Sequence, residues 1–86
     1  MMPCMDQNRI TTIANARAFA ASGVARALRR ASFLSLRDVA AEVGVAPSTV
    51  HAWETGKKVP SQENAARYGR LLTTLLQVEQ IAGEGR

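Results

Sequence analysis

Apolar residues recur at helical spacing along most of the chain, and the pattern is broken at glycines and prolines. Between residues 10 and 31 they fall three or four positions apart, which predicts an amphipathic helix. Ser22 and Gly23 interrupt this stripe, so we expect two segments, roughly 11–21 and 23–31. The positions predicted to face inward are Ile13, Ala16, Phe19, Ala20, Val24, Ala27, Leu28 and Ala31.

Two shorter helices with clear end signals follow. Ser35 and Asp38 have the spacing of a capping box, in which each side chain bonds the other residue's backbone N–H. The helix they begin should end at Gly44, because glycine readily adopts the left-handed conformation that closes helices. Pro47 suits the first position of a further helix, which should stop before Gly56. The inward positions of the two helices are Leu36, Val39, Ala40, Val43, Val50 and Trp53.

A long final helix is predicted after Ser61, which can cap it, and it could continue to Ile81. Its leucines at 71, 72, 75 and 76 are too many for one helix face to bury. We therefore expect a helix from another chain to cover part of a surface that comprises Leu72, Leu75, Leu76 and Glu79.

The chain as a whole is predicted to be all-α, a compact bundle of about five helices, because strand alternation and internal repeats are absent. Residues 1–9 are polar and lack periodicity, which favours a flexible N-terminal arm. The domain then covers 10–82, including a helix-turn-helix over 35–55, and 83–86 form a tail.

The short turn between the two middle helices has a geometric consequence. With so few residues between them the helices must cross steeply, and Val50 and Trp53 can anchor the second one in a small core. Its opposite face then stands outward, and a helix of this width fits the major groove of DNA. The small or polar side chains on that face are Pro47, Ser48, Thr49, His51 and Ala52.

Composition and charge favour binding over catalysis. The 86 residues carry a net charge of +4, which suits an anionic partner such as double-stranded DNA. Cys4 is the single cysteine, and no cluster of ligand residues predicts a metal or another cofactor. The sequence also lacks a nucleophile–base pair, a phosphate loop, a signal peptide and a membrane-spanning run. We expect a cytoplasmic protein that is not an enzyme.

The segment from Leu34 to Pro60 resembles the helix-turn-helix domain of the phage repressor and Cro family, also called Xre-type. Gly44, the Trp53-Glu54 pair, Gly56 and Pro60 fall at family spacing, and the resemblance extends over residues 24–76. It implies a lambda repressor-like bundle of about five helices that binds operator DNA as a dimer and regulates transcription.

Carried over by position, the resemblance implies roles for single residues. Pro47, Ser48 and Ala52 occupy base-contacting positions, and Thr49 and His51 flank the groove. Where the family often has a phosphate-binding glutamine this chain has Leu36, so Ser35 or Arg37 would have to serve. The remaining implied roles are phosphate contacts by Thr55, Gly56, Lys57 and Lys58, and a structural ion pair between Arg29 and Glu54.

Two functions fit these features. The leading hypothesis is a Cro-like repressor of a phage or mobile element that binds a palindromic operator as a homodimer. The alternative is an antitoxin or bridging factor whose main partner is another protein, bound through 10–21 or 71–81. A stable complex with a second protein would favour the alternative.

Overall fold

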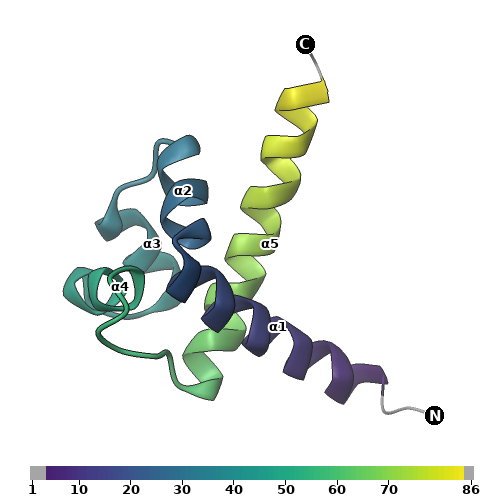
Figure 1. Cartoon of the computed structure of the whole chain (residues 1–86), viewed down its shortest axis with the longest axis vertical. Helices are drawn as coiled ribbons and strands as arrows, with labels where there is room; N and C mark the ends of the chain where they lie inside the picture. Colours follow the sequence, from purple (N-terminus) through teal and green to yellow (C-terminus); the bar gives the residue numbers. More distant parts are fainter. Residues whose placement is uncertain (1–3, 85–86) are drawn as a thin grey trace.

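The computed structural model describes the backbone of residues 4–84 and the side chains of residues 8–78, and it consists of helices joined by short turns and one longer loop. No strand occurs within the described backbone, and the predicted all-α fold is confirmed. Figure 1 shows the five helices in chain order: α1 (Cys4–Ser22), α2 (Val24–Ala31), α3 (Leu36–Val43), α4 (Pro47–Glu54) and α5 (Gln62–Glu84).

The predicted helix boundaries in the middle of the chain are confirmed. Gly23 separates α1 from α2 with a φ of 90°, and Gly44 ends α3 with a φ of 91°. Ser35 caps α3 in a complete capping box with Asp38. Pro47 begins α4 after Ala46, whose side chain provides no cap. The local chemistry of these residues therefore determines where the short helices begin and end.

The outer ends of the two long helices differ from the prediction. α1 begins at Cys4 rather than near residue 11, and α5 continues through Gly83 to Glu84. Residues 4–9 contain no glycine or proline, so no strong helix breaker stands among them. Hydrophobic periodicity did not predict this part of α1, because a helix end that projects from the molecule has no stripe of buried apolar residues. Residues 1–3 and 85–86 of the predicted arm and tail lie outside the described backbone.

Three of the four inward positions predicted for α2 are wrong, and only Leu28 is confirmed. Val24, Ala27 and Ala31 are exposed, whereas Ala25 and Leu28 are buried. The prediction continued the phase of α1 across Gly23. A residue in the left-handed conformation turns the chain and resets the direction in which the next helix presents its side chains. The break was placed correctly, but its effect on the phase was not included.

The centre of the molecule is the crossing of α1 and α5 (Figure 1). Gly69 of α5 lies so close to Thr12 of α1 that a Cβ at position 69 would be 2.6 Å from both Thr12 Cγ2 and the Thr12 carbonyl oxygen. Small residues allow this close approach. Alanine is accordingly the most frequent residue among the buried apolar side chains: Ala16, Ala20, Ala25, Ala40, Ala65 and Ala66.

The crossing leaves α3 and α4 on one side of the molecule. In Figure 1 the N-terminal end of α1 and the C-terminal end of α5 extend away from α2, α3 and α4 in two different directions. Trp53 of α4 packs on Tyr68 of α5, with ring centroids 4.9 Å apart, and this contact joins α4 to the central crossing. None of the helices between residues 4 and 84 combines the length and hydropathy that a bilayer crossing needs.

Candidate nucleic-acid interface

A tight turn fixes α4 against α3. The backbone N–H groups of Gly44 and Val45 both donate to the Ala40 carbonyl, at 2.7 and 2.9 Å, and this closes the end of α3. At the start of α4, the Thr49 N–H donates to the Ala46 carbonyl at 2.9 Å. Val50, at 0% exposure, and the side chains of α3 that face it are buried together in the core. The two helices therefore form one rigid unit.

The opposite face of α4 stands outward. Pro47, Ser48 and His51 are exposed, whereas Thr49 and Ala52 are half-buried. The exposed side chains concentrate in the first half of the helix, which is the end that meets base edges first when a helix enters the major groove. Ser48 and His51 can donate and accept hydrogen bonds there, while Pro47 offers only apolar contact.

The ion pair implied between α2 and α4 is present. Arg29 Nε lies 2.7 Å from Glu54 Oε2, and Arg29 Nη2 donates to Glu54 Oε1 at 3.1 Å. Arg29 Nη1 also donates to the Leu34 carbonyl at 2.9 Å, so one guanidinium joins α2, the turn after it and α4. The hydrogen bonds to Glu54 raise the pKa of Arg29 above its ordinary value. This clamp holds the C-terminal end of α4.

Tyr68 of α5 lies near this ion pair and is 1% exposed. Burial raises the pKa of Tyr68 far above its ordinary value, and the nearby Glu54 carboxylate adds to the effect. The phenol therefore stays neutral at any physiological pH. It supports α4 from below as a packing residue and brings no charge to the interface.

Besides the predicted Ser35 and Arg37, the start of α3 offers backbone donors that sequence reasoning overlooked. The Asp38 N–H donates to Ser35 Oγ at 3.0 Å, and the Ser35 hydroxyl, which also lowers the pKa of Asp38 by hydrogen bonding, would have to turn from that carboxylate to contact a phosphate. The N–H groups of Leu36 and Arg37 come first in the helix and have no acceptor among the described residues. A shallow depression of about 590 Å³ adjoins these donors and is lined by Arg29, Ser35, Leu36, Arg37 and Pro47. An anion placed there would meet both free N–H groups.

The loop after α4 offers charge instead of backbone donors. The N–H groups of Gly56, Lys57 and Lys58 all donate to carbonyls of α4. The Thr55 hydroxyl donates to the His51 carbonyl at 3.0 Å and would have to break that bond to contact a phosphate. The exposed ammonium groups of Lys57 and Lys58 are consequently the available phosphate-binding groups of this loop. Arg17 of α1 holds the far end of the loop by donating to the Pro60 carbonyl at 3.1 Å.

The predicted partner surface on α5 needs correction. Leu72 is 1% exposed and Leu75 is 7% exposed, so the chain itself covers both side chains. Because α5 packs against both α1 and α2, more of its surface is buried than contact with one helix would bury. Leu76, at 37% exposure, stays accessible. The Glu79 side chain lies outside the described residues.

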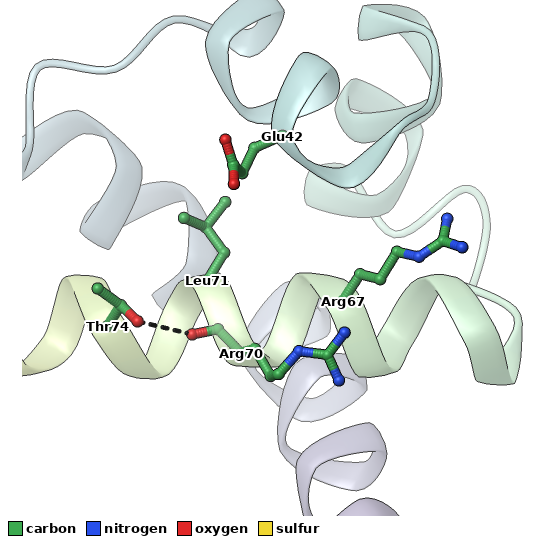
Figure 2. Close-up of a pocket in the computed structure, with 5 residues that line it drawn as sticks. All are labelled: Glu42, Arg67, Arg70, Leu71 and Thr74. Carbon is green, nitrogen blue, oxygen red and sulfur yellow. Dashed lines mark hydrogen bonds between the residues drawn. The ribbon is translucent and has the colours of Figure 1, made fainter.

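A second depression, of about 390 Å³, lies between α3 and α5 (Figure 2). Glu42 of α3 faces Leu71 across it, and Arg67 and Arg70 extend along its rim. Arg67 also pairs with Glu63 at 3.2 Å. Charges of both signs thus surround a shallow apolar floor.

Taken together, α3, the turn at Gly44 and α4 define a helix-turn-helix unit with an outward second helix, the class of structure that binds DNA. A family model described as a helix-turn-helix domain matches residues 20–80, which is most of the chain. The chain belongs to this helix-turn-helix domain family. No match was found among curated proteins or among solved structures.

Proposed function

We propose that this protein is a sequence-specific transcription regulator, a Cro-like repressor of a phage or mobile element that acts in the cytoplasm. The observation that carries the proposal is the division of α4 into two faces. Val50 and Trp53 are buried at 0% and 2% exposure, while Ser48 and His51 are exposed on the other side. A helix held in this way can enter the major groove without unpacking the core.

Base contacts would come from residues 47–52 of α4. Ser48 and His51 supply hydrogen bonds to base edges, and Thr49 supplies a hydroxyl at the margin of the groove. Pro47 and Ala52 can make apolar contact with a thymine methyl group. The exposed positions of Ser48 and His51 support these roles.

Phosphate contacts would lie near both ends of α4, on the two sides of the groove. The free N–H groups of Leu36 and Arg37, together with the Ser35 hydroxyl and the Arg37 side chain, lie at the end of α3 that adjoins Pro47. Lys57 and Lys58 follow the other end of α4. Contacts at both ends of α4 would fix its angle and depth in the groove, because phosphate contacts set register and orientation.

A single α4 contacts too few base pairs to select one site in a genome. A second copy would place another α4 about 34 Å away, one turn further along the same face of the duplex. Leu76, which is 37% exposed on the projecting part of α5, is available for contact between the copies. The proposed unit is therefore a homodimer on a palindromic operator.

The test is selection of bound sites from random duplex DNA, followed by affinity measurements on the selected site and on its single-base variants. Ser48→Ala and His51→Ala should change preference at particular positions by about 1–3 kcal/mol. Lys57→Ala with Lys58→Ala should weaken all duplexes alike and lower the slope of log affinity against log salt by about 2.

Gln77→Ala, an exposed change on α5 outside the proposed contacts, serves as the control and should match the unmodified chain. If Ser48→Ala and His51→Ala both leave every base preference unchanged, α4 does not contact bases and the proposal is wrong.

A second candidate function is binding of another protein, as an antitoxin or bridging factor. The observation that favours it is the exposed apolar side chain of Ile10 on α1, which is 65% exposed. Ile10→Asp would then abolish a stable complex with that partner while leaving affinity for DNA unchanged. A protein without such a complex in its native host would exclude this candidate.

A further inference from the structure

Phe33 combines two features that a folded chain normally avoids. Its side chain is 94% exposed, the highest value among the large apolar residues of the described chain. Its backbone also has a φ of 59°, and Phe33 is the one residue other than glycine with a positive φ in this part of the chain. A bulky residue in this conformation is strained, and such strain persists mainly at functional positions.

The turn itself does not need the ring. The Leu34 N–H donates to the Arg29 carbonyl at 3.1 Å, and the Phe33 N–H donates to the Arg30 carbonyl at 3.0 Å. This pair of bonds is a Schellman motif, whose left-handed position is usually glycine. Leu34 supplies the apolar contact of the motif by packing against the core. Glycine at position 33 would keep every one of these interactions, so folding gives no reason for phenylalanine.

The surroundings of Phe33 are cationic. Arg30 and Arg37, three residues before and four residues after it, are both exposed and form no ion pair with any described side chain. Ser35, two residues away, begins the depression shared with Pro47 at the start of α4. The nearest carboxylate in sequence, Asp38, is held in the capping box. Phe33 therefore lies within four residues of two exposed arginines and two residues before Ser35, where the proposed phosphate site begins.

We propose that Phe33 packs its ring against the deoxyribose of the bound duplex, next to the phosphate held by Ser35 and Arg37. This inference rests on the proposed DNA-binding function and extends its contact surface beyond the groove. A sugar offers an apolar edge between two phosphates, which suits an exposed ring that has exposed arginines near it in sequence. A protein partner would have to present a strongly acidic surface around an apolar pocket. The sugar-phosphate backbone of DNA instead offers negative charges beside apolar sugar edges along its whole length.

The decisive variant is Phe33→Gly, which removes the ring and relieves the backbone strain. It should raise Tm by about 2–6 °C, because glycine adopts a positive φ without penalty. It should also weaken affinity for the selected duplex about threefold to tenfold, through loss of buried apolar area. A chain that is more stable and yet binds more weakly cannot be explained by damage to the fold. Phe33→Tyr retains the ring and should keep wild-type affinity.

Hydroxyl-radical footprinting gives a direct measurement, because the radical attacks exposed sugars. The unmodified chain should protect a sugar outside the base pairs contacted by α4, and Phe33→Gly should lose that protection alone. Val24→Ala removes an exposed apolar side chain from α2 and serves as the matched control, with no change in the footprint.

Unchanged affinity and an unchanged footprint for Phe33→Gly would overturn the inference and assign the ring to a protein partner. Failure of the proposed function looks different, because the unmodified chain itself would then select no duplex. Phe33→Asn, which also tolerates the left-handed conformation, repeats the test if the glycine variant folds poorly.

Discussion

The Arg29–Glu54 pair shows how one contact can determine the position of α4. The Glu54 side chain is 2% exposed and the Arg29 side chain 13% exposed, so water can replace neither partner fully. Removal of one partner leaves a buried charge without compensation, and this is costly in a low-dielectric environment. The pair therefore matters for the shape of the interface although neither residue is expected to touch DNA.

Arg29→Met should lower the free energy of unfolding by about 3–5 kcal/mol, because Glu54 would remain buried and unpaired. Glu54→Leu should cost less, since Arg29 is the more exposed partner. The double variant Arg29→Met with Glu54→Leu should recover most of the loss. Urea denaturation of the four chains measures the difference. Equal and additive losses would contradict the view that the two side chains depend on each other.

At the scale of a helix, the cap of α3 links stability to pH. Hydrogen bonds from the Ser35 backbone N–H, and then from its side chain, hold the pKa of Asp38 below its ordinary value. A carboxyl group with a lowered pKa in the folded state stabilises the fold above its unfolded pKa. That contribution is lost as the pH falls through the lowered value.

Asp38→Asn should therefore be less stable than the unmodified chain at pH 7, and the difference should shrink as the pH falls below about 4. Thermal unfolding at several pH values measures it. Glu42→Gln, which removes a carboxylate from the same helix outside the cap, is the control. A difference for Asp38→Asn that stays constant down to pH 2 would show that the carboxylate charge is not responsible.

The helix boundaries and the buried residues were not equally predictable from sequence. Gly23, Gly44 and Pro47 act through their own backbone chemistry, so their positions predicted the boundaries well. The inward positions of α2 depend on how the chain continues beyond Gly23, which local spacing does not contain. The extra turn of α1 before residue 10 was missed because a projecting helix end has no apolar pattern.

The candidate interface divides in the same way. The outward positions of Ser48 and His51 follow from helical spacing around Val50 and Trp53, and sequence reasoning predicted them. The free N–H groups at the start of α3 have no side-chain signature, so a search by residue type placed no weight on Leu36. The burial of Leu72 was also missed, because it depends on how closely α1 and α5 approach at Gly69.

At the scale of the whole molecule, the projecting half of α5 should hold the second copy. Leu76→Glu places a charge on an exposed apolar position and should convert a dimer into a monomer without unfolding it. Sedimentation measures the mass, and circular dichroism checks that the helices remain. Gln77→Glu, one residue further and therefore on a different face, should stay dimeric. A dimeric Leu76→Glu chain would exclude this part of α5 as the interface.

The alanine-rich core has a consequence for the lifetime of the protein. Short side chains bury little apolar area, so the free chain has a small margin against unfolding. A ligand that binds only the folded state adds to that margin according to its concentration and affinity. Copies bound to DNA would then be protected from cellular proteases. Unbound copies would unfold more often and would be degraded first. Degradation of the unbound copies alone would thus adjust the amount of this protein to the number of DNA sites that it occupies.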